Sequence, residues 1–131
     1  MSNFDLSKVN NIDYIFRDCN SLRELHLGNM NTSLIKSFEC LFYHCEQLES
    51  IDLSTFDTTS LTSTAWMFFH CYSLKSIEFP DTFNTSNVNK MYAMFSHCKS
   101  LISLNLSIFD FKKVTNTSYM FNNCKKLKYL N

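Results

Sequence analysis

Apolar side chains return along this chain with a period of about 26 residues. Five cysteines show the period most clearly, since they are separated by 26, 26, 27 and 26 residues: Cys19, Cys45, Cys71, Cys98 and Cys124. A second column lies fifteen residues before these cysteines and holds Phe4, Met30, Phe56, Phe83 and Phe109. A third is phenylalanine throughout, at Phe16, Phe42, Phe68, Phe95 and Phe121. Columns that keep one register indicate an internal repeat. We predict a single domain over 1–131, with repeats at 4–29, 30–55, 56–82, 83–108 and 109–131.

Each repeat has two halves with different apolar periods. In the fourth repeat, steps of three, three, one and three place five side chains on one face of a helical turn or short helix: Val88, Met91, Met94, Phe95 and Cys98. Farther along, Leu104 and Leu106 flank the polar Asn105, which is the alternation of a strand with one buried face. The pattern therefore predicts one short strand and one helical segment in every repeat.

A unit this short cannot bury its apolar side alone, so neighbouring repeats must stack and turn each column into a ladder. We therefore predict an α/β repeat solenoid of about five coils. Its parallel sheet lies on the concave face and its short helical segments on the convex face. The one extra residue falls within 78–81, where the strand ends and Pro80 suits a strand exit.

The strand segments carry a recurring leucine spacing, L-x-x-L-x-L, in SLRELHLGN, QLESIDLST and SLISLNLSI, with SLKSIEF in the third repeat. This spacing is the signature of leucine-rich repeats. The longer pattern FNTSNVNKMYAMFSHCKSLISLNLS resembles the BspA-type leucine-rich repeats of bacterial and protist surface proteins. The resemblance implies a right-handed coil and a role in cell adhesion or protein–protein interaction, at the cell surface or after secretion. The chain departs from those surface proteins because MSNFDLSKVN does not read as a signal peptide.

Composition narrows the range of partners. Twelve basic and twelve acidic residues leave a formal net charge of zero, so no global field draws the protein to nucleic acid or to an anionic membrane. No segment approaches the roughly 18 consecutive apolar residues of a membrane span, so we expect no membrane insertion. Gly28 is the only glycine, which excludes a glycine-rich phosphate loop, and we expect no cofactor. These observations favour a protein partner.

The cysteine column admits a disulfide or a metal interpretation. Stacked cysteines with parallel Cβ vectors lack the torsion that a disulfide needs, and one cysteine per repeat does not supply converging metal ligands. We therefore interpret the column as buried free thiols. Cys40 lies outside the column, and we expect it to be a partly exposed or peripheral thiol.

Three histidines precede column cysteines in consecutive repeats, at His44, His70 and His97. Such a column could bind a transition metal or respond to pH near its ordinary pKa. Solvated polar residues at a turn are the plainer interpretation, and we predict no metal site.

Catalysis requires a nucleophile, a base and an orienting group at one place. Here serine, histidine, cysteine and aspartate recur in register, and we find no break in the repeat that would mark a unique constellation. We therefore predict a non-enzymatic protein and rank a metal-binding or enzymatic role third.

The outward-facing strand positions are polar and slightly acidic. In a repeat protein these positions line an extended surface that is available to a partner. Six of them are candidate contacts for a protein partner on the concave strand face: Glu24, His26, Asp52, Glu78, Asn105 and Tyr129.

The ends of the array offer an alternative. Repeat proteins generally need polar caps, whereas Phe121, Leu127 and Leu130 have no following segment to cover them. The alternative prediction is therefore a structural, self-assembling element that associates through its uncapped ends.

Overall fold

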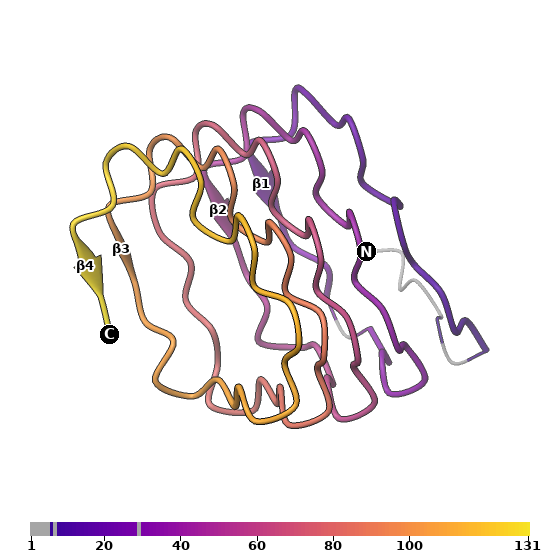
Figure 1. Ribbon diagram of the computed structural model, residues 1–131. Coiled ribbons are helices and arrows are strands. Elements are labelled where there is room, and N and C mark those ends of the chain that lie inside the picture. Colours follow the sequence, from indigo (N-terminus) through magenta and orange to yellow (C-terminus); the bar gives the residue numbers. More distant parts are fainter. Residues whose placement is uncertain (1–5, 7, 29) are drawn as a thin grey trace.

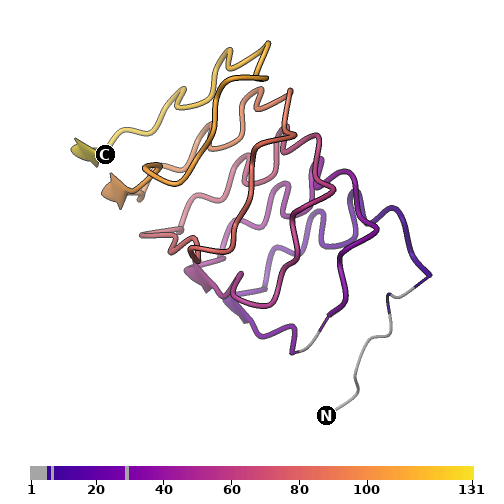
Figure 2. The same ribbon diagram turned by 90° about the horizontal axis from the view of Figure 1, so that it is seen from below.

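The computed structural model describes residue 6 and residues 8–28 and 30–131. Successive passes of the chain lie side by side, and the first and last repeats lie at opposite ends of the array (Figure 1, Figure 2). Strands one repeat apart pair in parallel, β1 with β2 and β3 with β4. Phe4, the first member of one predicted column, falls outside the described residues. The strands found within those residues are β1 (Glu24–Leu25), β2 (Ser50–Ile51), β3 (Ser103–Leu104) and β4 (Tyr129–Leu130).

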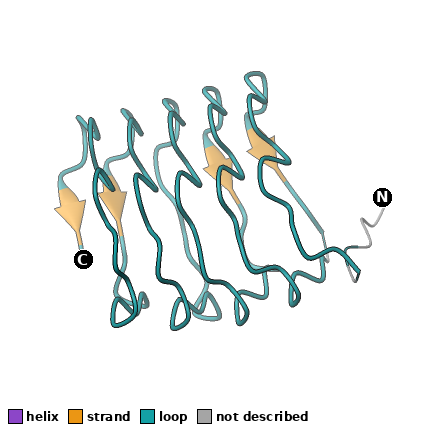
Figure 3. Ribbon diagram, turned by 45° about the vertical axis from the view of Figure 1, so that its right-hand side comes forward, coloured by secondary structure: helices purple, strands orange, loops and turns teal. Residues whose placement is uncertain are grey.

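The predicted fold class, an α/β right-handed solenoid with helical segments on its convex face and a sheet on its concave face, is wrong. The described part of the chain contains no helix and runs mostly in turns and loops (Figure 3). The backbone explains the difference, because two residues other than glycine in every repeat have a positive φ, whereas an α-helix needs a φ of about −63°. These left-handed residues are Tyr14, Asp18, Cys40, His44, Trp66, His70, Ala93, His97, Tyr119 and Asn123.

The left-handed residues close two tight turns in each repeat. In the third repeat, the Met67 N–H donates to the Thr64 carbonyl at 3.2 Å, and Trp66 just before Met67 has a φ of 56°. His70 occupies the same place in the next turn, with a φ of 63°. A positive φ at the third position is what a type II turn requires. Turns that are closed by a hydrogen bond over three residues repeat apolar side chains at nearly the same interval as a helix does. This similarity is why the sequence pattern predicted a helical segment.

Backbone hydrogen bonds join the turn segment of each repeat to the next repeat. The Phe42 N–H donates to the Met67 carbonyl at 2.9 Å, and the Phe68 N–H donates to the Met94 carbonyl at 2.9 Å. Alternate amides take part, so some close turns within a repeat while the others reach the neighbouring repeat. We call these bonds between repeats the turn ladder. It pairs backbone groups that would otherwise be buried without a partner.

The sequence pattern predicted a continuous parallel sheet along the array, but the strand pairing is interrupted. β2 belongs to the second repeat and β3 to the fourth, and the third repeat contributes an isolated bridge between Asp52 and Glu78. The extra residue of the third repeat follows Glu78, around Pro80, which has no N–H to donate. No strand pair or bridge joins the strand segments of the third and fourth repeats within the described residues, although the Ile102 N–H still donates to the Lys75 carbonyl at 3.2 Å. The turn ladder crosses the same junction, with the Trp66 N–H 2.9 Å from the Tyr92 carbonyl.

A stack of phenylalanine rings runs through the core. Rings one repeat apart are nearly parallel, with centroids separated by 5.5, 5.5, 5.9 and 5.8 Å: Phe16, Phe42, Phe68, Phe95 and Phe121. Phe42, Phe68 and Phe95 are fully buried. Stacked aromatic pairs contribute beyond the area that they bury. The phenylalanine column and its place in the core are therefore confirmed.

The column cysteines connect consecutive repeats. Each of four thiols donates to the carbonyl of the stacked phenylalanine in the preceding repeat, at 3.0, 3.2, 3.2 and 3.0 Å: Cys45, Cys71, Cys98 and Cys124. Burial raises the pKa of Cys45 to about 12, so the thiol keeps the proton that it donates. All six cysteines are free, which confirms the prediction of unpaired thiols. Cys40 is only 6% exposed, so the predicted partial exposure of its thiol is wrong.

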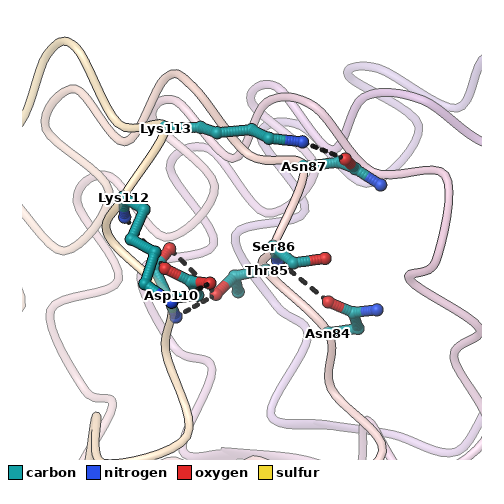
Figure 4. A network of polar contacts seen from close by, with 7 residues as sticks. All are labelled: Asn84, Thr85, Ser86, Asn87, Asp110, Lys112 and Lys113. Carbon is teal, nitrogen blue, oxygen red and sulfur yellow. Dashed lines mark hydrogen bonds and ion pairs between the residues drawn. The ribbon is translucent and has the colours of Figure 1, made fainter.

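A polar network joins the beginnings of consecutive repeats. In the fourth repeat the Asn84 side-chain oxygen accepts the Ser86 N–H at 2.9 Å, which closes a turn (Figure 4). The Thr85 hydroxyl between them accepts the Asp110 N–H of the next repeat at 2.7 Å. Thr85 is 1% exposed, so its oxygen satisfies a donor that has little access to water.

We predict opposite effects of glycine at two equally buried alanines. Ala93 and Ala65 are each 2% exposed, but only Ala93 has a left-handed φ, of 51°. Glycine relieves that strain, so Ala93→Gly should leave the free energy of unfolding unchanged or raise it by up to about 1 kcal/mol. Ala65→Gly should lower it by about 0.5–1 kcal/mol. Urea denaturation followed by circular dichroism measures both variants, and equal destabilisation would contradict this account of the turns.

Candidate interaction surface on the strand face

The six predicted contact residues lie on one side of the repeats and are all exposed. We call the surface that they form the strand face: Glu24, His26, Asp52, Glu78, Asn105 and Tyr129. Backbone pairing fixes their spacing, because Glu24 lies opposite Ser50, Asp52 opposite Glu78, and Ser103 opposite Tyr129. Parallel pairing places equivalent side chains of neighbouring repeats next to each other.

The structure gathers four of these residues around one depression. Its volume is about 310 Å³, and Glu24, His26, Asp52 and Glu78 line it together with neighbouring strand residues. Three carboxylates and one imidazole thus surround a single hollow that spans the first three repeats. The surface there is acidic when His26 is neutral.

A second depression continues the surface toward the last repeat. Its volume is about 240 Å³, and its lining includes Glu78, Asn105 and Tyr129. Glu78 and Ser76 line both depressions, so the two hollows adjoin. Tyr129 is 64% exposed and offers the largest apolar area among the six. No predicted residue is isolated from the others.

Two of the six side chains also have a structural role. The Asp52 carboxylate accepts the Ser54 N–H at 2.9 Å, and the Asn105 side chain accepts the Ser107 N–H at 2.9 Å. Hydrogen bonds from the Ser54 hydroxyl and N–H lower the pKa of Asp52, and the His26 charge adds a smaller effect. Asp52 and Asn105 therefore stabilise the turns that follow their strand segments and keep only part of their hydrogen-bonding capacity for a partner.

A row of charges beside the strand face was missed in the sequence. Arg23 and Glu49 directly precede β1 and β2, with Nη1 and Oε1 3.6 Å apart, and Lys75 Nζ lies 2.7 Å from the Glu49 carboxylate. The hydrogen bond from Lys75 lowers the pKa of Glu49. These residues occupy equivalent positions one repeat apart, so alignment of the repeats could have revealed the row.

The histidine column places three tilted imidazole rings next to one another in consecutive repeats. His44, His70 and His97 have ring centroids 4.3 Å apart in each consecutive pair. His70 Nδ1 lies 3.0 Å from the Tyr72 hydroxyl, and the Asn123 amide nitrogen lies 2.9 Å from His97 Nε2. Within the described residues, no group of three or more histidine, cysteine or acidic side chains is arranged to hold a metal ion.

The close packing of the histidine rings also affects their protonation. Burial, followed by the nearby charges of His44, His97 and Lys99, lowers the pKa of His70 from 6.5 to about 4. Burial likewise lowers the pKa of His97. The folded protein therefore favours the neutral imidazole at His70 and at His97.

Over residues 6, 8–28 and 30–131, no helix is long and apolar enough to cross a membrane.

Acidification should destabilise the fold through this column. Because the folded pKa of His70 is about 4 and its ordinary value is 6.5, stability is fully present above pH 6.5 and decreases as the pH falls toward 4. His70→Asn should reduce this dependence, since Asn123 occupies the equivalent left-handed position in the last repeat. His26→Asn, at an exposed histidine outside the column, is the control. Urea denaturation between these pH values measures the effect, and an unchanged pH dependence in His70→Asn would contradict it.

Comparison with known proteins places these features in a family. The family described as "Mycoplasma protein of unknown function, DUF285" matches residues 1–79 and 80–130. The crystal structure of a leucine-rich repeat protein from Bacteroides ovatus is similar at 19% sequence identity and a TM-score of 0.39, covering 91% of this chain and 39% of that one. The chain thus spans well under half the length of that protein. No curated protein matches the chain significantly. With nearly every residue matched, the chain belongs to the DUF285 family of Mycoplasma proteins of unknown function.

Proposed function

We propose that this repeat protein is a non-enzymatic interaction or adhesion module that binds a protein partner through its strand face. The observation that carries the proposal is the convergence of six exposed side chains around two adjoining depressions. A BspA-type assignment forms part of this proposal, and the leucine spacing of SLISLNLSI supports it. Adhesion at a cell surface follows from that assignment.

The size of the strand face suits a protein better than a small substrate. Side chains from all five repeats contribute to the strand face, and paired strands of neighbouring repeats lie about 4.8 Å apart. The hollows adjoin, and side chains from several repeats contribute to each. The exposed tyrosine at one end, Tyr129, is of a residue type that is enriched at protein interfaces. Small-molecule sites are instead concave and mostly apolar.

The charge of the strand face indicates the chemistry of its partner. Glu24, Asp52 and Glu78 surround the larger hollow, and the lowered pKa of Asp52 keeps its carboxylate ionised. A partner surface that carries lysine or arginine would complement this charge. The contribution should weaken with added salt, because the carboxylates are exposed.

Charge reversal on the strand face tests the proposal. The double variant Asp52→Lys and Glu78→Lys should bind its partners at least about tenfold more weakly, since attraction becomes repulsion at the centre of the larger hollow. Asp81→Lys is the matched control, because Asp81 is exposed but lines neither hollow of the strand face. Quantitative mass spectrometry of proteins captured by each variant, followed by affinity measurements on the purified partners, gives the comparison. The same partners held equally well by all variants would contradict the proposal.

Self-association is a second candidate, favoured by an apolar surface on the last repeat. A depression of about 830 Å³ there is lined by Leu106, Phe111, Thr117, Tyr119, Met120, Phe121, Asn122, Leu130 and Asn131. Phe111, Tyr119 and Leu130 are 42%, 62% and 50% exposed. Clustered exposed apolar side chains mark surfaces that associate.

A single substitution should separate assembly from strand-face binding. Leu130→Asp places a charge in the apolar depression and should lower the apparent mass measured by light scattering at micromolar concentration. Leu34→Asp is the matched control, since Leu34 is 51% exposed in the second repeat and lies outside this depression. A monomeric wild-type protein, or equal effects of both substitutions, would contradict self-association through this surface.

A further inference from the structure

A surface pocket lies apart from the strand face and contains the only tryptophan of the chain. Its volume is about 560 Å³, within the range of roughly 300–1,000 Å³ that is usual for small-molecule sites. Its lining includes Trp66 and Tyr92, with Glu39, Lys90 and Asn116 around them. It shares no residue with either hollow of the strand face.

Two half-buried aromatic rings form an apolar corner in this pocket. The Trp66 and Tyr92 ring centroids are 4.9 Å apart, and the ring planes meet at 64°. Ala65, 2% exposed, contributes only a methyl group beside them and leaves room above the backbone. The turn ladder holds the two rings in place, because the Trp66 N–H donates to the Tyr92 carbonyl at 2.9 Å. The corner thus lies on the turn side of the junction between the third and fourth repeats, where backbone hydrogen bonds join the two repeats.

Polar groups of both signs surround the corner. The Ser63 hydroxyl, which is nearly buried, donates to one Glu39 carboxylate oxygen at 2.6 Å and orients that side chain. The Asn116 side-chain oxygen accepts the Ser118 N–H at 2.9 Å, which leaves the Asn116 amino group as a donor. Among the described residues, none accepts a hydrogen bond from Asn116 Nδ2 or Lys90 Nζ. The rim therefore offers the Glu39 carboxylate, which Ser63 orients, together with the Lys90 ammonium group and the Asn116 amide donor.

We propose that this pocket binds a neutral saccharide, with the C–H face of a pyranose ring against Trp66. A pyranose has an apolar face and a rim of hydroxyl groups that both donate and accept, which matches aromatic rings bordered by an acceptor and two donors. A cationic ligand would meet Lys90, and an anionic ligand would meet Glu39. A hydroxyl-rich neutral ring can use both charged groups as hydrogen-bonding partners without an uncompensated charge.

The pocket arises where the repeat is broken. The position of Tyr92 is held in the other repeats by Asp13, Glu39, Ala65 and Ser118, so only the fourth repeat supplies an aromatic ring there. Glu39 and Ala65 are themselves members of that column. One column therefore supplies the carboxylate, the small residue and the second ring of the pocket.

Tryptophan fluorescence tests the proposal, because Trp66 is the only emitter of its kind in the chain. The wild-type protein is titrated with chitotriose, cellotriose and maltotriose. We expect a saturable change in emission with at least one of them, at a dissociation constant on the order of 1 mM. Tyr92→Ala and the isosteric Glu39→Gln should each weaken that binding at least about tenfold. Tyr14→Ala is the matched control, since Tyr14 occupies the Trp66 position two repeats earlier and should leave binding unchanged.

Saturation-transfer NMR on the sugar protons provides a second measurement. Trp66→Leu should abolish saturation transfer, and near-native circular dichroism would show that this variant is folded. The proposal is overturned if no trisaccharide changes the emission or shows saturation transfer up to about 10 mM, tenfold above the expected constant. A response only to tetramethylammonium chloride, or binding that Tyr92→Ala and Glu39→Gln leave intact, would also overturn it. Because the pocket and the strand face share no residue, neither result depends on the proposed protein partner.

Discussion

The turn ladder is the constraint on which the rest of the structure depends. In every repeat, left-handed residues close tight turns, and the amides that remain reach carbonyls of the next repeat. A left-handed conformation is unfavourable for residues such as Trp66 and Tyr14, and it persists only where the surroundings impose it. The hydrogen bonds between repeats hold these residues in the left-handed conformation. Each repeat is therefore conformationally defined by its neighbour rather than by its own sequence alone.

Side-chain stacking follows from this backbone register. Once Phe42 and Phe68 are hydrogen-bonded into equivalent places, their rings come to lie nearly parallel with centroids 5.5 Å apart. The same register places the Cys71 thiol at the Phe42 carbonyl and the Thr85 hydroxyl at the Asp110 amide. Columns that look like simple apolar repetition thus combine packing with specific hydrogen bonds, and few buried polar groups are left without a partner.

The sequence predicted which side chains are buried better than it predicted the backbone that buries them. Val88, Met91 and Cys98 are fully buried, as their spacing indicated, yet they lie at the ends of tight turns and not on a helix. Turn residues are usually recognised by glycine, asparagine or aspartate, but among the ten left-handed non-glycine positions only Asp18 and Asn123 are of these types, so the usual signal was weak. The loop at Pro80 was predicted, but the interruption of strand pairing that accompanies it was not, because pairing depends on the register of two repeats.

The candidate surfaces could likewise be predicted only where their position does not depend on how two repeats are placed relative to each other. Alternation around Asn105 was enough to place the strand-face residues on an exposed side, since a two-residue period needs no knowledge of neighbouring repeats. The contact between Trp66 and Tyr92 could not be found that way, because these residues belong to different columns of different repeats. Their proximity appears only when the repeats are stacked in three dimensions. Residues that depart from a column are therefore as informative as those that keep it.

The interrupted strand pairing gives the array a mechanical asymmetry. Repeats joined in series transmit a load through every junction, and the junction between the third and fourth repeats is bonded firmly on the turn side but sparsely on the strand side. Bending should concentrate there, with the turn side as the axis of a hinge and the strand side opening or closing. Glu78 lies at this junction and lines both hollows, so flexing would change the distance between them. The strand face would then adjust its curvature to the surface that it meets, with little distortion inside either half.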